Sequence, residues 1–143
     1  MAIIDEANQW PAYMPPREAW AEPFWSALSE GRLMLQVCDQ CHLSIYPATE
    51  AHCTACGSSL SWVTASGQAR LWSWVTFHRE YYPGYPLPPP YTVVMAELPE
   101  GVRMLATLVT EALPENLQFE CELLFAPIEL APGVFIPGFR PLS

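Results

Sequence analysis

The sequence predicts a mostly β chain in which a short N-terminal helical arm precedes a four-cysteine ribbon and a five-stranded barrel. Three observations predict this fold class. The 143 residues include 16 prolines against 7 glycines, and 13% are aromatic, which suits short strands with stiff connections better than long helices. Four of the five cysteines form two C-x-x-C pairs between residues 38 and 56. Five strand-like runs follow within about 75 residues, the usual extent of a small Greek-key barrel of the OB type.

The first 16 residues carry three prolines, with Trp10 and Tyr13 among them. This spacing excludes a regular helix or strand. Two interpretations remain open, a disordered end or an arm that lies on this protein or on a partner.

A short helix is expected in residues 22–33, "EPFWSALSEGRL". Pro23 suits the first turn of a helix. Phe24, Ala27 and Leu28 share one face, and Gly31 can end the helix in the left-handed conformation.

The ribbon begins with a strand at residues 33–37 and leaves through a second strand, "SWVT", at residues 61–64. Between them lie the four cysteines, Cys38, Cys41, Cys53 and Cys56. Two C-x-x-C turns brought face to face offer four sulfurs in a tetrahedron, the geometry that Zn²⁺ prefers. Such a closed site stabilises structure and leaves no position for substrate. We therefore expect a structural Zn²⁺ site, although iron in the same sulfur cage is an alternative that the spacing leaves open.

Both pairs have a notable neighbour. Gly57 follows the second pair and allows the backbone to fold over a sulfur, whereas His42 stands at the matching place of the first pair. His42 and His52 are rival ligands, but a residue adjacent to a cysteine points the wrong way to replace it. Two symmetric pairs also speak against a thioredoxin-like redox site, which needs one pair at a helix N-terminus.

The barrel strands are expected at residues 69–77, 91–98, 102–109, 117–125 and 133–139. The tripeptide "PEG" at residues 99–101 predicts a tight hairpin, and "TEALPEN" at residues 110–116 is long enough to cross a barrel end. In the fourth run, alternation places Cys121 on an apolar face with Leu117, Phe119, Leu123 and Phe125, so that its thiol should be inert. These predictions divide the chain into an arm with a short helix (1–33), a rubredoxin-like zinc ribbon (34–62) and an OB-fold domain (63–143).

An aromatic and proline-rich loop, "YYPGYPLPPPY", follows the first barrel strand. It contains Tyr81, Tyr82, Tyr85 and Tyr91. Tyrosines on a proline-ordered loop suit a contact with another protein, and we predict a partner interface that also includes Trp10 and Tyr13. The alternative is that the tyrosines only cap the barrel's own core.

The formal charge is −9, with six arginines and no lysine. Four thiolates and one Zn²⁺ would lower it by two, to −11. Nucleic-acid binders rely on neutralising phosphates, so binding of nucleic acid is not expected. The N-terminus lacks the basic and apolar regions of a signal peptide, and no run approaches the length of a transmembrane helix. We expect a cytoplasmic protein without a membrane contact.

No catalytic set is evident. His78 lies beside Arg79 and Glu80 with no nucleophile to serve, and the sequence lacks Gly-rich phosphate loops and the G-x-S-x-G and H-E-x-x-H motifs. An enzyme acting alone is not expected.

Several stretches in this order resemble one family: "FWSALSEGRLMLQVCDQCHLSIYPATEAHCTACGSS", "LWSWVTFHR", "PPPYTVVMAELPEGVRMLATLV" and "GVFIPGFRP". The chain is similar to the acyl-CoA-associated zinc-ribbon and OB-fold family from Phe24 to Pro141. The resemblance implies a small non-catalytic subunit that bridges thiolase-like, ketosynthase-fold enzymes and helps to line a CoA or acyl-substrate passage. It also implies that Cys38, Cys41, Cys53 and Cys56 bind Zn²⁺.

The first hypothesis is therefore a scaffold subunit of a thiolase-like acyltransferase complex that forms carbon–carbon bonds. Within the family's settings, a short unfused chain favours a phloroglucinol-type C-acetyltransferase complex. The alternative from another class is a nucleic-acid-binding OB module, and a small zinc enzyme is the third.

Overall fold

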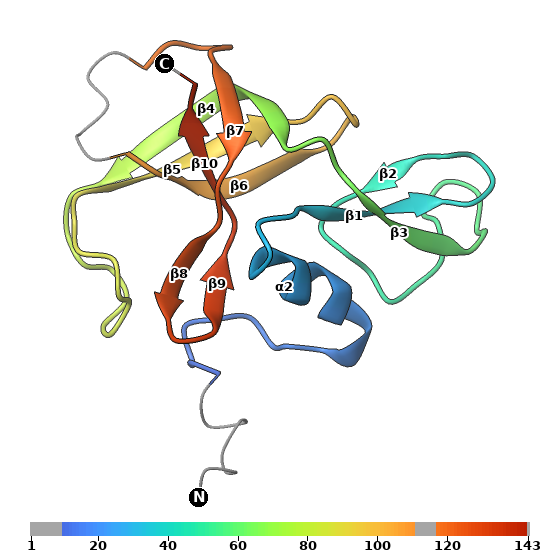
Figure 1. Cartoon of the computed structure of the whole chain (residues 1–143), viewed down its shortest axis with the longest axis horizontal. Coiled ribbons are helices and arrows are strands. Elements are labelled where there is room, and N and C mark those ends of the chain that lie inside the picture. The colour runs from blue at the N-terminus through green and yellow to red at the C-terminus, as the bar shows by residue number, and fades with distance from the viewer. Residues whose placement is uncertain (1–9, 111–116, 143) are drawn as a thin grey trace, which may run out of the picture.

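The computed structural model describes residues 10–110 and 117–142. A helical segment and a three-stranded ribbon lie beside a closed five-stranded barrel, as Figure 1 shows. The mostly β fold class with one short helix, a ribbon and an OB-type barrel is confirmed.

A 3-10 turn, η1 (Ala19–Ala21), leads directly into the helix α2 (Glu22–Leu28). Phe24, Ala27 and Leu28 are buried, as the periodicity predicts. The helix ends before Gly31, which at φ 78° reverses the chain as the sequence predicts. The Gly31 N–H donates to Leu28 and the Arg32 N–H donates to Ala27, both at 3.0 Å, which is the paired hydrogen bonding of a Schellman motif.

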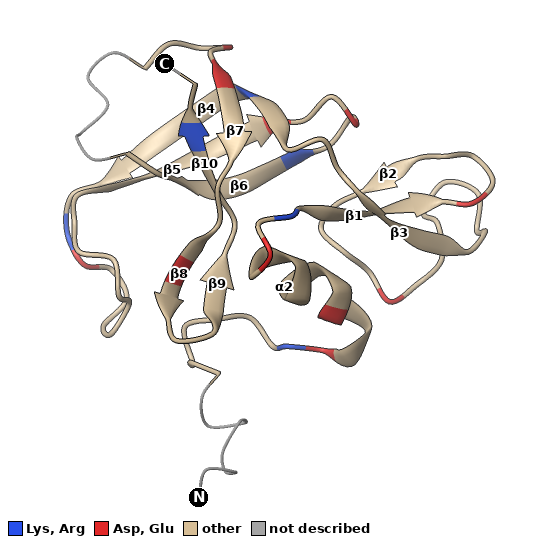
Figure 2. Cartoon of the chain, in the orientation of Figure 1, with Lys and Arg blue, Asp and Glu red and all other residues tan. Residues whose placement is uncertain are grey.

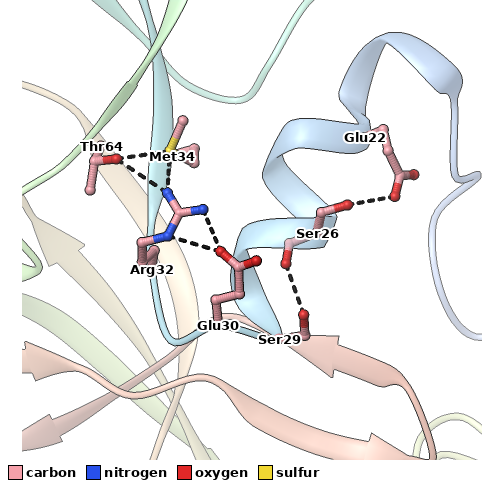
Figure 3. A network of polar contacts seen from close by, with 7 residues as sticks. All are labelled: Glu22, Ser26, Ser29, Glu30, Arg32, Met34 and Thr64. Atoms are coloured by element: carbon pink, nitrogen blue, oxygen red, sulfur yellow. Dashed lines mark hydrogen bonds and ion pairs between the residues drawn. The ribbon is translucent and has the colours of Figure 1, made fainter.

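Polar contacts connect the end of this helix to the ribbon (Figure 3). The Arg32 guanidinium forms an ion pair with Glu30 and hydrogen-bonds the Thr64 hydroxyl at 3.3 Å. Within the helix, the Ser26 hydroxyl donates to the Glu22 carboxylate at 2.7 Å. The turn after α2 is thus fastened to the last residue of strand β3.

The ribbon is a three-stranded antiparallel sheet with β1 in the middle. Its strands are β1 (Met34–Cys38), β2 (Ser44–Ile45) and β3 (Leu60–Thr64). Leu35 is buried against the helix and barrel, whereas the edge strand β3 leaves Val63 46% exposed. The ribbon therefore shares the hydrophobic core of the barrel on one side only.

The barrel closes in the order β10-β6-β5-β4-β7. Its strands are β4 (Gln68–Phe77), β5 (Tyr91–Glu97), β6 (Arg103–Leu108), β7 (Glu122–Phe125) and β10 (Gly138–Pro141). Closure depends on β10, which pairs parallel with β6 and antiparallel with β7. The interior is filled by fully buried side chains that include Leu71, Val94, Met104, Leu123 and Phe139.

The fourth predicted strand, residues 117–125, is wrong in its first half. A turn occupies this part, because Glu120 has φ 66° and the Cys121 N–H bonds back to Gln118. Phe119 is 68% exposed instead of buried, and its ring packs on Trp74 at 5.0 Å between centroids. Cys121 is half-buried at the edge of the core.

The last predicted strand, residues 133–139, is two strands. Pro137 has no N–H to donate and separates β9 (Val134–Ile136) from β10. The chain uses β9 to form a hairpin with β8 (Ile128–Ala131), which the sequence did not predict. Only β10 enters the barrel.

The tight turn at residues 99–101 is confirmed: the Leu98 N–H bonds to Val102 at 2.9 Å, and Gly101 has φ 98°. Most of the predicted crossing loop, residues 111–116, lies outside the described residues. Within the part of the chain that the structure describes, no helix is long and apolar enough to span a bilayer.

Candidate metal centre

The four ribbon cysteines form one cluster of sulfur atoms. The Sγ atoms of Cys38, Cys41, Cys53 and Cys56 all lie within 4.8 Å of one another. The Cys38 and Cys56 sulfurs are 3.4 Å apart, and those of Cys41 and Cys53 are 3.7 Å apart. A tetrahedral site with Zn–S bonds of about 2.3 Å places its sulfurs about 3.8 Å apart. The cluster therefore fits a single Zn²⁺ with four thiolate ligands.

The two cysteine turns have the same backbone geometry. The His42 N–H donates to Cys38 at 3.0 Å, and the Gly57 N–H donates to Cys53 at 2.9 Å. Both donors adopt the left-handed conformation, with φ 61° for His42 and 80° for Gly57. A side chain is strained in this conformation. The first turn therefore carries backbone strain at His42, whereas Gly57 avoids that strain in the second turn.

Hydrogen bonds in the second turn favour the thiolate form of its cysteines. Hydrogen bonds from Ser58, through its side chain and its backbone N–H, lower the pKa of Cys56 to about 6. The backbone N–H groups of Cys56 and Ala55 lower the pKa of Cys53. Two of the four sulfurs thus lose their protons readily, as metal ligands must.

The first turn differs. The Leu43 N–H favours the Cys41 thiolate, but the hydrogen-bonded Cys38 sulfur and burial outweigh it and raise the pKa of Cys41 to about 12. Four adjacent thiolates repel one another, and a bound divalent cation removes this penalty. All four cysteine thiols are therefore ionised together only when a metal is bound.

Asp39 connects the two arms of the ribbon next to the cluster. Its carboxylate accepts hydrogen bonds of 2.6 Å from both the Ser59 and the Ser61 hydroxyls, and its N–H donates to Ser59 at 3.0 Å. These hydrogen bonds lower the pKa of Asp39. This clamp was not predicted, although the sequence carries a signal for it: an aspartate inside the first C-x-x-C and two serines after the second.

The rival histidine ligands lie outside the cluster. His42 and His52 are both exposed, and neither belongs to the group of residues whose ligand atoms converge. The ligand set of the cluster is therefore four sulfurs.

Two family models match the chain in sequence order. Residues 25–61 match the rubredoxin-like zinc ribbon domain of ChsH2, and residues 62–120 match the C-terminal OB-fold domain of ChsH2. The chain belongs to the ChsH2 zinc-ribbon and OB-fold family. This agrees with the resemblance seen in the sequence, and the four cysteines of the zinc ribbon are suited to binding zinc.

The ChsH2-type chain is similar to three known proteins. It is 30% identical over 142 residues to a probable enoyl-CoA hydratase alpha subunit from Thermomonospora curvata, covering 96% of this chain and 43% of that protein. The chain thus spans less than half the length of this curated relative. A solved structure titled Ltp2-ChsH2(DUF35) aldolase has a TM-score of 0.79 and 27% identity, covering 91% of this chain and 100% of that one. A DUF35-family protein from Sulfolobus solfataricus, with a TM-score of 0.58 and 16% identity over 97% of this chain and 94% of that one, shares the fold.

The predicted interface aromatics are gathered in two places of this ChsH2-type chain. Trp10 packs edge-on against Trp25 of the helix, with centroids 5.2 Å apart, so the arm lies on its own chain from this residue onward. Tyr13 packs against Tyr85 at 5.5 Å, and Tyr85 packs against Tyr91 at 5.7 Å. These residues are half-buried within the chain.

The other two loop tyrosines remain open to solvent. Tyr81 is 62% exposed and Tyr82 is 49% exposed, although Tyr81 contacts Phe77 and the Tyr82 hydroxyl reaches the Ala12 carbonyl at 3.4 Å. The loop therefore joins the arm to the barrel and leaves the side chains of Tyr81 and Tyr82 exposed. Its use as an interface stays a prediction.

Proposed function

We propose that this chain is an accessory subunit of a thiolase-like enzyme complex that acts on acyl-CoA substrates, and that it contributes no catalytic residue. One observation carries the proposal: the chain is similar over the whole length of the DUF35 chain in a solved structure titled as an aldolase with Ltp2. An aldolase makes or breaks a carbon–carbon bond, and the relative from Thermomonospora is named as a subunit of a CoA-dependent enzyme. The thiolase-like nature of the partner comes from the family resemblance of the sequence.

The chemistry of the metal centre supports a structural role. Four sulfur ligands complete the coordination of Zn²⁺, whereas a catalytic site keeps one position for water or substrate. In the proposed role, Zn²⁺ holds the two cysteine turns of the ribbon together and the partner supplies the reacting groups. The finer assignment of the acyl acceptor to a phloroglucinol has no support in the names of the relatives.

The charge distribution supports a protein partner over nucleic acid. Four of the six arginines contact a glutamate in the described structure; the pairs are Arg17–Glu22, Arg32–Glu30, Arg70–Glu120 and Arg103–Glu97. Few cations are left to neutralise phosphates, which supply most of the affinity in nucleic-acid binding. We infer that the chain works in the cytoplasm on other proteins.

The proposal is tested by affinity purification of the tagged chain from its own host at native expression, with the bound proteins identified by mass. Recovery of a thiolase-like protein in a fixed ratio would support an accessory subunit. The purified chain should show no thiolase or aldolase activity alone and should restore the activity of that partner when added back. Activity of the isolated chain, or recovery of nucleic acid that is lost in high salt, would refute the proposal.

A further inference from the structure

The outer side of the barrel carries an apolar surface that the described residues leave uncovered. It is formed by strands β4, β5 and β6, and we call it the outer sheet face. Leu105 is 60% exposed, Val75 is 51% exposed and Trp72 is 46% exposed. Soluble chains seldom leave adjacent large apolar side chains open to water without a function.

The strand register places these side chains next to one another. Ser73 lies opposite Met95, and Met95 lies opposite Leu105, so the three form one row across the sheet. Val75 belongs to the next row. Directly opposed side chains lie about 5 Å apart on a sheet, so this is a continuous surface and not a set of isolated residues.

Trp72 reaches this face because of an irregularity in β4. The pairing shifts between Leu71 and Ser73, which makes Trp72 the extra residue of a β-bulge. Leu71 is fully buried, whereas Trp72 points outward and stacks with the Arg103 guanidinium, 4.1 Å from the ring centroid. Bulges re-aim single side chains in this way. The exposed position of Trp72 is therefore fixed by the backbone of the bulge.

The chain itself covers the other end of the same face. Tyr91 lies opposite Phe77 at the ends of β5 and β4, and the rings of the tyrosine loop pack there. Tyr85 hydrogen-bonds the side chain of Thr107, which is buried. Aromatic side chains of the tyrosine loop thus pack on one half of the face, which indicates that aromatic and apolar groups fit this surface. The exposed half begins where the loop ends.

Charges define the border of the open half. Figure 2 shows β4, β5 and β6 free of charge along most of their length, with charged residues at their ends. At one end lies a cleft of about 730 Å³ whose lining includes Arg70, Glu97, Glu120 and Glu122. Arg70 pairs with Glu120 at 3.7 Å and Arg103 pairs with Glu97 at 3.3 Å, which leaves the Glu122 carboxylate in excess. A partner that covers the face therefore needs a basic side chain opposite this cleft.

We propose that the outer sheet face is the surface on which the catalytic subunit docks, through apolar side chains over Leu105, Met95 and Trp72 and a lysine or arginine in the acidic cleft. This proposal rests on the proposed function for the class of partner. A second copy of this chain fits less well, because each copy carries a formal charge of −9 and would bring the same carboxylates to the contact.

The test uses the full-length chain and the purified thiolase-like subunit recovered by the affinity experiment. Leu105→Asp places a charge in the middle of the face, and Val63→Asp is the matched control, because Val63 is 46% exposed on strand β3 of the ribbon, away from the barrel face and the cleft. Far-UV circular dichroism and zinc content verify that both variants fold. Leu105→Asp should raise the Kd at least about 30-fold, as expected for a charge buried at an interface centre, and Val63→Asp less than about threefold.

A second variant tests the charge argument. Glu122→Lys removes one carboxylate from the cleft and should slow association about tenfold at low salt, with a smaller effect at 0.5 M NaCl, since steering is screened by salt. The control for this variant is Glu129→Lys on the β8 hairpin, where the same change should leave the association rate within about twofold.

The outcomes separate the two proposals. If the wild-type chain binds the thiolase-like subunit and Leu105→Asp binds equally well, the docking face is wrong and the proposed function stands. If no thiolase-like subunit binds the wild-type chain, both are wrong. A concentration-dependent dimer in light scattering that Leu105→Asp abolishes, or quenching of Trp fluorescence by a single-stranded DNA 20-mer that Trp72→Ala removes, would assign the face to a second copy or to nucleic acid and overturn the proposal.

Discussion

Closure of the barrel depends on a glycine that has no room for a side chain. Gly138 begins β10, and a Cβ placed there would lie 2.5 Å from the Ala126 carbonyl oxygen. It would also lie 3.1 Å from a methyl group of Val109 and 3.2 Å from Ile128. The Gly138 carbonyl accepts a hydrogen bond of 2.8 Å from the Ala126 N–H, which holds the two backbones together. Gly138→Ala must therefore push β10 away from the segment after β7.

The size of the effect follows from the distance. The 2.5 Å approach must open by about 0.9 Å to reach an ordinary contact of 3.4 Å, and the Ala126 oxygen belongs to the backbone and cannot rotate away. Overpacking of this kind costs about 1–3 kcal/mol, and the loss of ladder hydrogen bonds in β10 places Gly138→Ala near the upper end. For a chain of this length, a change of about 3 kcal/mol lowers Tm by about 10 °C.

The free energy of unfolding is measured by urea denaturation followed by Trp fluorescence, and Tm by calorimetry. Gly84→Ala is the control, because Gly84 has φ +89° with nothing within 4 Å of its Cβ position, so only backbone strain of about 1 kcal/mol is expected. If Gly138→Ala costs no more than Gly84→Ala, closure of the barrel does not depend on the close approach and the reasoning fails.

Three further predictions concern the ribbon and the helix. Cys53→Ser should lose the bound zinc and the fixed structure of the ribbon, because one of four ligands is gone; mass spectrometry of metal content and near-UV circular dichroism measure this, and full zinc occupancy would contradict it. His42→Gly should stabilise the zinc-bound protein by about 0.5–1 kcal/mol, since it relieves a side chain held at φ 61°; urea unfolding would show no gain if the strain is absent. Hydrogen bonds from Arg17 and then Ser26 lower the pKa of Glu22. The stabilisation is therefore present above the ordinary value of 4.5 and lost as the pH falls below it. Glu22→Gln should cost at most about 0.5 kcal/mol at pH 7, given that the pair is exposed to solvent, and equal stability curves from pH 3 to 7 would rule the contact out.

Local chemistry made much of this protein predictable. The spacing of Cys38, Cys41, Cys53 and Cys56 indicated a metal site because tetrahedral coordination by paired turns needs little beyond that spacing. Gly31 ends the helix as expected, because few other residues adopt φ 78° without strain. The strand expected at residues 91–98 is confirmed as β5 (Tyr91–Glu97), along which Val94 and Ala96 alternate into the core.

The wrong predictions concern stretches whose pattern of apolar residues fits more than one backbone conformation. An alternating run at residues 117–125 fits a strand, but only Glu122–Phe125 forms strand β7, because the chain turns at Glu120. Pro137 was the signal that the run at residues 133–139 is divided, but the sequence did not show that its first half forms a hairpin with β8. The aromatic residues Trp10, Tyr13 and Tyr85 carried no information on whether they face a partner or one another.

By itself the sequence determined the fold class, the metal ligands and the acidic charge, because each depends on residue type, spacing or composition within a short stretch of chain. Only the tertiary structure decided that the arm from Trp10 packs on the chain's own helix. It also decided that Trp72, Met95 and Leu105 form one open apolar face with carboxylates at its end. Such a surface depends on strand register and on a single β-bulge, which are fixed when distant segments pair and are not encoded in any one of them.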